Sequence, residues 1–348
     1  MKLLLTGASG HLGANLVRRL LADGHEVRCL LRSGSNNAAV DGLPIERFYG
    51  DLRDLGALHK AVAGIERCYH CAAKISTLDG EEQEVFDCNV MGTRNLLQAA
   101  REGSVGRVVV TGSFSAVGHR PGRPSDERDP FNMFDHVMPY EKSKAGIEHE
   151  CLKAAVEGQD VVVATSSAIL GPNDFKPSRM GAVVRDFANG KLRAYIPGGF
   201  EFVATRDIVE GHVLAMEKGR SGQKYIISSG YASVDDLMEI LSRVTGRPGP
   251  RLRLPAPVMA VVAEITHFVG THFFPKMPQR LTPGAVRILR QNRRADTSKA
   301  RRELGFRPTS LEKAIAEAYE HFVERGLSDG KEAPGRRVTD LKSRESAA

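Results

Sequence analysis

The sequence lacks the features of a secreted, disulfide-bonded protein. Its five cysteines, at positions 29, 68, 71, 88 and 151, are odd in number and irregularly spaced. A disulfide framework is usually recognised by an even number of cysteines at regular spacing. We therefore expect free thiols and a reducing, cytoplasmic setting.

Long hydrophobic runs are also missing. The N-terminal leucines, Leu3 to Leu5, lead directly into a glycine turn and are too few for the core of a signal peptide. The most apolar stretch, 255–274, contains Glu264, His267 and His272. Such side chains argue against a membrane-spanning helix, so we expect a soluble protein.

Most of the chain lacks an excess of charge of either sign, because acidic and basic residues are nearly balanced in number. Basic residues exceed acidic ones by 49 − 42 = +7, but 276–307 alone holds ten basic residues against Asp296 and Glu303, which is 10 − 2 = +8. No recognition motif or interleaved aromatic residues accompany this charge, so we expect no nucleic-acid partner. The segment 255–307 could make peripheral membrane contact, because basic residues there adjoin apolar residues at helical spacing. The alternatives are a solvated basic face beside a core helix, or a wall for an apolar substrate.

Metal ligands at a recognisable spacing are missing too. Cys68 and Cys71 have CxxC spacing, but there is no second pair. On a strand these two residues would face opposite sides of the sheet. The eleven histidines form no HExxH-type cluster. We predict no metal site.

The first half of the chain instead alternates short β-like runs with helix-like segments. Strands separated by helices are typical of βαβ units around a parallel sheet with right-handed crossovers. The sequence therefore predicts an α/β fold with a Rossmann-type doubly wound parallel sheet. The expected strands are Lys2–Thr6, Glu26–Leu31, Glu46–Tyr49, Arg67–His70, Arg107–Thr111 and Asp160–Ala164, and the expected helices are His11–Ala22, Leu55–Ala63, Gln83–Arg101 and Tyr140–Ala155.

A glycine-rich turn joins the first strand to the first helix. Glycines at positions 7, 10 and 13 suit a tight turn, close approach of a pyrophosphate to the backbone, and close packing of the helix on the strand. The helix N-terminus then offers unpaired N–H groups to the anion. The spacing is GxxGxxG, and a plain structural turn is the alternative interpretation. The predicted cofactor-binding residues of this turn are Gly7, Ser9, Gly10, His11, Leu12 and Gly13.

The end of the second strand bears on which dinucleotide is bound. An NAD site usually places a carboxylate there to hold the ribose 2′-hydroxyl. Here the strand runs into Arg32 and Ser33 without a carboxylate. A guanidinium suits a 2′-phosphate, so we predict NADP(H), with NAD(H) possible. A solvated arginine at the strand end is the alternative.

The pattern loosens after residue 165. Gly171-Pro172, Pro177 and 197–199 indicate loops. A helix is expected after Asp207, and another from Ser233 to Val244, where a serine cap and two acidic residues precede apolar residues at helical spacing. Gln223–Ser228 resembles a strand.

This change of pattern indicates two domains. We interpret 1–165 as a dinucleotide-binding domain and 166–327 as a smaller, mostly helical and discontinuous substrate domain. Return segments to the sheet are expected near 200–230 and 290–298. Residues 328–348 lack apolar periodicity and are expected to form a disordered tail.

Tyr140 and Lys144 are four residues apart, on one face of a predicted helix. A free tyrosine has a pKa of about 10 and is a poor acid–base catalyst at neutral pH. A nearby ammonium group would lower that pKa. Hydroxyls at 111, 113 and 115 follow a predicted strand, at the edge where open α/β sheets bind ligands.

These features together resemble the extended short-chain dehydrogenase/reductases, also called the NAD-dependent epimerase/dehydratase family. The resemblance runs from about residue 2 to 325, and is greatest to the dihydroflavonol-reductase and 3β-hydroxysteroid-dehydrogenase-like branch. Bacterial hopanoid-associated sugar epimerase-like proteins are also similar. The resemblance to the family rests on the segments 7–13, 50–52, 70–73, 89–93, 140–144, 170–174 and 296–306, together with Ser113.

The resemblance implies roles for these residues. Tyr140 would move the proton, Ser113 would orient the carbonyl oxygen, and Lys144 would lower the tyrosine pKa and bind the nicotinamide ribose. Ser115 is a fallback for Ser113, and Asn89 is an auxiliary residue that orders the site, joins a proton relay or simply packs. The remaining cofactor contacts that it implies are Asp51, Leu52, Ala72, Ala73, Lys74, Thr111 and Ser166. The chain departs from the pattern at Gly112, where relatives often carry a serine, and at Ser166, where they often carry a proline.

The leading hypothesis is thus an NADP(H)-dependent oxidoreductase that interconverts a ketone or aldehyde and an alcohol on a partly apolar small-molecule substrate. One alternative is a sugar-nucleotide epimerase or dehydratase with tightly bound NAD(P), in which Arg179, Arg185 and Arg206 would hold the substrate diphosphate. A second is a non-catalytic NADP(H)-binding subunit. A homodimer is expected.

Overall fold

The computed structural model of the chain describes residues 1–76, 80–133, 138–255 and 283–328. Its centre is a seven-stranded sheet in the order β10-β6-β5-β4-β1-β2-β3, and every neighbouring pair is parallel. The predicted Rossmann-type doubly wound sheet is therefore confirmed. The strands are β1 (Lys2–Thr6), β2 (Glu26–Leu31), β3 (Glu46–Tyr49), β4 (Arg67–His70), β5 (Arg107–Ser113), β6 (Val161–Ser166) and β10 (Lys224–Ile227).

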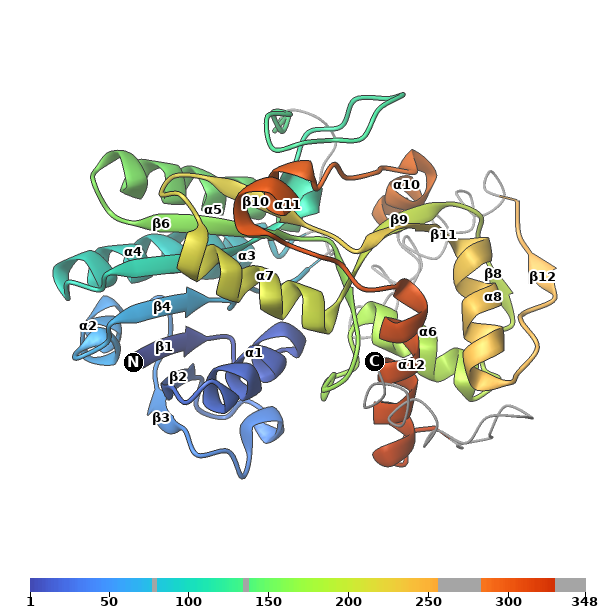
Figure 1. The fold of residues 1–348 in the computed structure, drawn as a ribbon, viewed down its shortest axis with the longest axis horizontal. Coiled ribbons are helices and arrows are strands. Elements are labelled where there is room, and N and C mark those ends of the chain that lie inside the picture. The colour runs from blue at the N-terminus through green and yellow to red at the C-terminus, as the bar shows by residue number, and fades with distance from the viewer. Residues whose placement is uncertain (77–79, 134–137, 256–282, 329–348) are drawn as a thin grey trace.

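Helices cover both faces of this sheet (Figure 1). Alternate residues of β1 point to opposite faces, so Leu3 and Leu5 join one apolar core while Leu4 joins the other. Cys68 packs into the second core and Cys71 against the first, on opposite faces as predicted. The first core is closed by α1 (His11–Ala22), α7 (Thr205–Lys218) and α11 (Ser298–Leu304), and the second by α2 (Leu55–Val62), α4 (Gly92–Glu102) and α5 (Pro139–Val156).

The helix predicted at Gln83–Arg101 is not continuous. The chain forms α3 (Glu82–Phe86), a π-helical turn η2 (Asp87–Met91), and then α4. A π turn inserts an extra residue and shifts the phase of the following helix. Sequence periodicity could not show it, because the apolar positions on either side remain compatible with one helix.

Much of the second half of the chain packs around its own apolar cluster. Figure 1 shows the helices of this part beside the large sheet. This part is mostly helical, as predicted, and it also contains a three-stranded sheet in the order β11-β9-β7. A two-stranded pair, β12 with β8, lies apart from that sheet. The elements are β7 (Ala168–Leu170), α6 (Arg179–Ala188), β8 (Ala194–Tyr195), β9 (Gly199–Ala204), β11 (Gly230–Ser233), α8 (Val234–Thr245), β12 (Leu252–Arg253), α10 (Pro283–Gln291) and α12 (Leu311–Glu324).

The chain crosses back to the large sheet through α7 and β10, and again through α11. The strand order reverses direction between β1 and β4. In open α/β sheets, ligands bind at the carboxyl ends of the strands at such a reversal point. The predicted tail beyond residue 328 and most of the apolar stretch 255–274 lie outside the described residues.

Among the described residues, no helix combines the length and the apolar character that crossing a bilayer requires.

Candidate active site

The turn between β1 and α1 requires glycine at two positions. Gly7 has a φ of +79°, and a Cβ there would lie 2.6 Å from the backbone nitrogen of Ala72. A Cβ on Gly13 would lie 2.1 Å from the carbonyl oxygen of Gly7. Both positions therefore exclude a side chain, one beside the β4 loop and one where the helix meets the turn.

The start of α1 is open to an anion. Gly10 precedes the helix, and no side chain caps it. The first N–H groups of the helix thus lack an internal partner, and they lie at the carboxyl edge of the sheet. Ser9 is half-buried beside them, and Leu12 is buried in the core. These residues fit a bound pyrophosphate.

His11 contributes its ring as well as its backbone to this turn. Its Nε2 lies 3.0 Å from the carbonyl oxygen of Pro172 and 3.2 Å from the hydroxyl of Thr205. Burial lowers the pKa of His11, against the opposing effect of Asp174. The ring therefore joins the glycine turn to the segment that follows β7.

Arg32 lies directly after β2 and is exposed. The nearest acidic candidate, Asp51, follows β3, and its carboxylate is held by Arg53 at 2.8 Å, which lowers the pKa of Asp51. Lys176, which sequence reasoning missed, belongs to the same neighbourhood: burial lowers its pKa, and the charge of Arg32 adds to that effect. This end of the site is thus cationic.

The loop after β4 is held by Asn89 of the π turn. Asn89 is fully buried, accepts the backbone N–H of Lys74 at 2.7 Å and donates to the carbonyl oxygen of Lys74 at 2.9 Å. It also donates to Ser143 Oγ at 2.9 Å, one residue before Lys144. Asn89 therefore connects the loop to α5. The flanking Ala72 and Ala73 are half-buried, Leu52 is buried, and the Lys74 ammonium pairs with Glu81 and Glu84.

A chain of hydrogen bonds passes through the buried ring of His70. The Ala72 N–H donates to Thr6 Oγ1 at 3.3 Å, and Thr6 Oγ1 lies 2.7 Å from His70 Nδ1. His70 Nε2 lies 2.9 Å from Thr93 Oγ1, which donates to the carbonyl oxygen of Asn89 at 2.6 Å. Burial lowers the pKa of His70 to about 3, so the ring is neutral. The chain joins the glycine-turn strand to the π turn.

Lys144 is buried beneath the end of β5. Its ammonium group donates to the carbonyl oxygen of Thr111 at 2.8 Å, and burial lowers its pKa to about 8. The Thr111 hydroxyl is in turn 2.8 Å from Nε2 of His212, whose other ring nitrogen lies 2.7 Å from the carbonyl oxygen of Ile208. His212, on α7, is a supporting residue that the sequence did not indicate.

The hydroxyls predicted for catalysis meet at the carboxyl end of β5. Ser113 Oγ lies 2.8 Å from Ser115 Oγ and hydrogen-bonds to Tyr140. Ser113 is paired in register with Ser166, which ends β6 and donates to the carbonyl oxygen of Ser167. Ser113, Tyr140, Lys144 and Thr111 are thus brought together, whereas Arg32 and Asp51 lie at the ends of β2 and β3 on the other side of β1.

The expected effect of Lys144 on Tyr140 needs correction. Burial raises the pKa of Tyr140 to about 12, and the hydrogen bond to Ser113 opposes this. The Lys144 nitrogen lies 5.9 Å from the centre of the tyrosine ring and is committed to Thr111. Desolvation is the largest cause of the raised pKa, and the charge of Lys144 is not among the causes.

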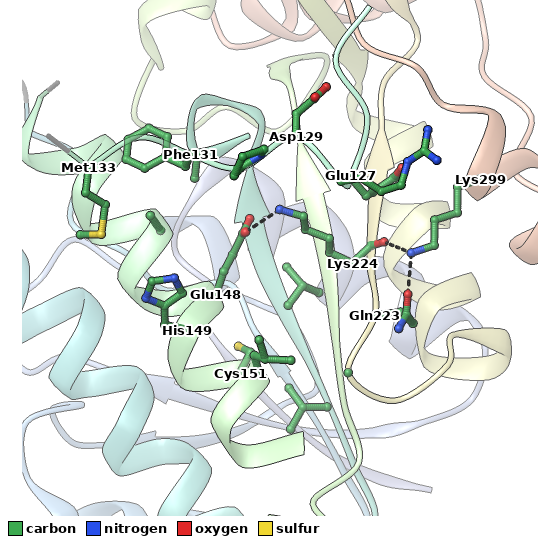
Figure 2. A pocket seen from close by; sticks show the side chains of 18 residues that line it. Glu127, Asp129, Phe131, Met133, Glu148, His149, Cys151, Gln223, Lys224 and Lys299 are labelled. Carbon is green, nitrogen blue, oxygen red and sulfur yellow. Dashed lines mark hydrogen bonds and ion pairs between the residues drawn. The ribbon is translucent and has the colours of Figure 1, made fainter. Parts of the chain in front are cut away.

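A hollow of about 390 Å³, lined in part by residues of α5, is not this site (Figure 2). Its lining includes the pair of Glu148 and Lys224, joined at 2.8 Å, and Lys299, which donates to Gln223 at 2.8 Å. None of Ser113, Tyr140 and Lys144 lines it. Within the described residues, no group of three or more His, Cys, Asp or Glu side chains could hold a metal ion.

Comparison with known proteins identifies the family of this chain. The model of the NAD-dependent epimerase/dehydratase family matches residues 3–228, which is more than half of the chain. The chain belongs to the NAD-dependent epimerase/dehydratase family. The resemblance that the motifs indicated is therefore confirmed.

Three similar proteins illustrate the likeness. The chain is 45% identical to "Sterol demethylase protein B" of Methylococcus capsulatus, over 94% of this chain and 100% of the relative. It is 28% identical to a 3β-hydroxysteroid dehydrogenase/Δ5→4-isomerase of Mycobacterium tuberculosis, over 92% and 90%. The solved dTDP-glucose 4,6-dehydratase of Streptomyces venezuelae, with NAD bound, is 26% identical with a TM-score of 0.75, over 94% and 99%.

Proposed function

We propose that this chain is an NADP(H)-dependent oxidoreductase that interconverts a ketone or aldehyde and an alcohol on a partly apolar substrate. The observation that carries the proposal is the convergence of Ser113, Tyr140 and Lys144 at the carboxyl end of β5. These side chains share the sheet edge with the glycine turn and the open start of α1.

The chain's own groups provide the acid–base part of this reaction. With a pKa near 12, Tyr140 is a neutral phenol at physiological pH and can donate its proton to a carbonyl oxygen. Ser113 holds the Tyr140 hydroxyl and can donate a second hydrogen bond to the same oxygen. The Lys144 ammonium donates to the carbonyl oxygen of Thr111 at 2.8 Å and so holds the end of β5 beneath these groups. When bound, the nicotinamide cofactor supplies or accepts the hydride.

The preference for NADP(H) rests on the cationic end of the site. Arg32 is exposed at the tip of β2, has no carboxylate beside it on that strand, and is near Lys176. We expect Arg32→Asp to raise KM for NADP⁺ by about tenfold or more and to lower KM for NAD⁺, because a carboxylate repels a 2′-phosphate and accepts a bond from a 2′-hydroxyl. An unchanged ratio of the two KM values would refute the assignment. Arg53→Asp is less informative, because it also releases Asp51.

A sterol-type alcohol or ketone is the substrate class we propose. Two relatives that match over nearly their whole lengths carry sterol or steroid names. The test is reduction of a panel of sterol ketones and oxidation of the matching 3-alcohols, followed by the cofactor absorbance at 340 nm with either nucleotide. Tyr140→Phe should lower kcat by about 100-fold or more and leave cofactor affinity within about twofold, because it removes only the transferable proton.

The sugar-nucleotide alternative predicts a different result in the same assay. Among the arginines proposed for a substrate diphosphate, Arg185 pairs with Asp186 at 3.0 Å and Arg206 pairs with Glu317. An epimerase would convert a UDP-sugar without added cofactor and show no net turnover of NADPH. A non-catalytic subunit would bind NADP(H), as measured by calorimetry, and turn over neither substrate class.

A further inference from the structure

An arginine from the late part of the chain holds the turn that carries the catalytic serine. Arg293 lies between α10 and α11, and its Nη2 donates to the carbonyl oxygens of Val117 at 2.6 Å, Gly118 at 3.2 Å and Phe114 at 3.4 Å. The guanidinium carbon lies 4.7 Å from the centre of the Phe114 ring. One side chain therefore fixes three backbone groups that are distant in sequence by more than 170 residues.

The turn that Arg293 holds begins at Ser113. Residues Phe114–Ala116 form a short 3-10 helix, η3, and the Val117 N–H closes it on the carbonyl oxygen of Phe114 at 3.1 Å. Ser113 caps this turn by accepting the Ser115 N–H at 3.3 Å. The direction of the Ser113 hydroxyl, and hence its bond to Tyr140, is set by the shape of the turn.

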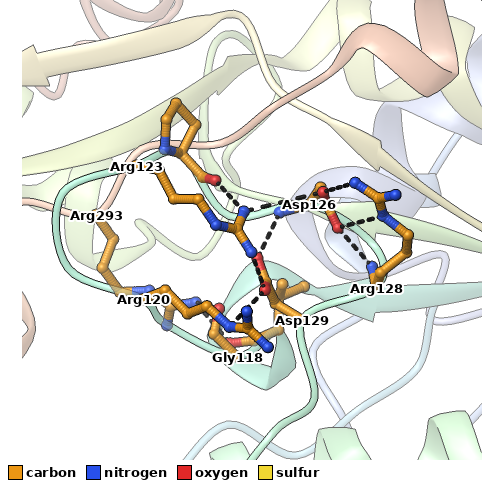
Figure 3. A network of polar contacts seen from close by, with 9 residues as sticks. Gly118, Arg120, Arg123, Asp126, Arg128, Asp129 and Arg293 are labelled. Atoms are coloured by element: carbon orange, nitrogen blue, oxygen red, sulfur yellow. Dashed lines mark hydrogen bonds and ion pairs between the residues drawn. The ribbon is translucent and has the colours of Figure 1, made fainter.

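The far end of the turn is fixed as well. The Gly118 N–H donates to the carbonyl oxygen of Asp129 at 3.0 Å, and a Cβ on Gly118 would lie 2.2 Å from the carbonyl oxygen of Pro130. Figure 3 shows the Asp129 carboxylate between Arg120 and Arg123, with Arg293 on the Gly118 side. Arg293 thus binds the turn on one side, while the Gly118–Asp129 contact holds the turn on the other side.

The guanidinium is suited to this position for two reasons. It remains charged although burial lowers its pKa, an effect that the charges of Glu141 and Asp129 oppose. It also has several N–H donors in one plane, whereas an ammonium is a point charge. The hydrogen bonds of this half-buried side chain all go to backbone carbonyl oxygens, so its role is to fix the backbone.

We propose that Arg293 is a positioning residue, which holds the Phe114–Gly118 turn so that the Ser113 hydroxyl meets Tyr140. It would act through Ser113 without touching substrate. This inference rests on the proposed oxidoreductase function for its kinetic test, but its geometric content can be measured without turnover.

The kinetic test is a double-mutant cycle between Arg293→Met and Ser113→Ala. Arg293→Met should lower kcat by about tenfold or more while KM for the cofactor stays within about twofold, because the reacting groups are misplaced and the nucleotide contacts are not. In the Ser113→Ala background the same change should cost less than about twofold. Arg294→Met is the matched control, since Arg294 rests on the Tyr231 ring at 4.7 Å and does not bond to the turn. Full additivity, or a kcat of Arg293→Met within twofold of wild type, would overturn the proposal.

A second readout separates this proposal from the proposed function. In protein with ¹³Cζ-labelled tyrosine, the Tyr140 resonance is identified among seven by its loss in Tyr140→Phe. Its chemical shift should move in Arg293→Met, move less in the folded variant Arg293→Lys, and stay unchanged in Arg294→Met. A moved resonance in a protein inactive on alcohols would refute the oxidoreductase and keep the positioning role. An unmoved one in folded variants would refute the positioning role.

Discussion

Burial acts in opposite directions on Tyr140 and Lys144. A dry environment disfavours the charged form of each group, so it raises the pKa of the phenol to about 12 and lowers that of the ammonium to about 8. Near neutral pH the tyrosine therefore keeps its proton and the lysine is mostly charged. This is the protonation state that carbonyl reduction needs.

The pH dependence of reduction should follow Lys144. As pH rises through about 8, Lys144 loses its charge and with it the charge-assisted hydrogen bond that holds the Thr111 carbonyl beneath the site, so we expect kcat/KM for ketone reduction to fall by about tenfold per pH unit above that point. The measurement is a pH–rate profile at saturating cofactor. Lys144→Met should be weak at every pH and lose this alkaline limb. A wild-type pH–rate profile that stays flat to about two pH units above the pKa of Lys144 would contradict the role proposed for Lys144.

The sequence predicted the residues of the site better than it predicted their electrostatics. Ser113, Tyr140 and Lys144 belong to short motifs at fixed positions relative to strands, so order along the chain was enough to bring them together. The supporting residues His212 and Arg293 touch the site across 101 and more than 170 residues of chain. No local pattern marks them. The raised pKa of Tyr140 depends on three-dimensional burial, which the spacing of Tyr140 and Lys144 does not contain.

At the scale of elements, the π turn η2 is the least ordinary feature. It places Asn89 so that one amide side chain reaches Lys74 on one side and Ser143 on the other. π turns are rare and occur mostly within longer helices near functional sites. The π turn η2 lies between the loop after β4 and α5, beside the candidate active site, as is common for such turns.

Removal of the Asn89 amide should be costly. Asn89→Leu takes the side-chain partner away from the half-buried N–H and carbonyl groups of Lys74, and an unsatisfied buried group of this kind costs about 1–3 kcal/mol. We expect the free energy of unfolding in urea to fall by about 3 kcal/mol. Asn95→Leu is the comparison variant, because Asn95 makes one bond, at 3.2 Å to the carbonyl oxygen of Leu52, and should cost about 1 kcal/mol. Equal losses of unfolding free energy in the two variants would show that the hydrogen bonds of Asn89 stabilise the fold no more than the single bond of Asn95.

Long, strongly patterned elements were predictable and short ones were not. Four strands and α1 have the bounds that the sequence predicted, because apolar runs and turn residues mark both ends. The strands β7 and β8 have three and two residues and lie just before the segments Gly171-Pro172 and 197–199, which the sequence marks as loops. Their pairing comes from packing against the rest of the second cluster, so the amount of strand there was underestimated.

At the scale of the whole molecule, the basic segment 276–307 is partly used inside the fold. Arg293 binds the catalytic turn, Lys299 donates to Gln223 and to the carbonyl oxygen of Lys224, and Arg287 pairs with Glu141 at 3.5 Å. Some of the local excess charge therefore has structural partners. Peripheral membrane contact through 255–307 and a homodimer stay predictions.

Two buried histidines should make stability depend on pH. Burial lowers the pKa of His70 to about 3 and that of His212 to about 4, whereas in the unfolded chain both titrate near the ordinary value of about 6.5. Below about pH 6.5 the unfolded state binds protons that the folded state does not, so stability falls as pH falls, by up to about 1.4 kcal/mol per pH unit for each ring.

The check is urea unfolding at about pH 7, 6 and 5. His212→Gln should flatten the pH dependence between the two lower values by about 1 kcal/mol per pH unit, whatever it does to stability at pH 7. His149→Gln, at an exposed position of α5, should leave the slope unchanged. A slope in His212→Gln that equals that of wild type would show that the ring is not the source.

The chain of bonds through His70 has a consequence when its protons are counted. Thr93 gives its only hydroxyl proton to Asn89, so the ring must carry its proton on Nε2 and leave Nδ1 to accept from Thr6. A second proton on the ring would turn Nδ1 into a donor, and the Thr6 hydroxyl would then have to find a new acceptor while the Ala72 N–H already points at it. Each hydrogen bond in this chain is donated in the same direction, from Ala72 towards Asn89, and each hydroxyl or ring N–H proton is already used. The protein interior can therefore accept a proton here only by breaking the connection between its first strand and its π turn.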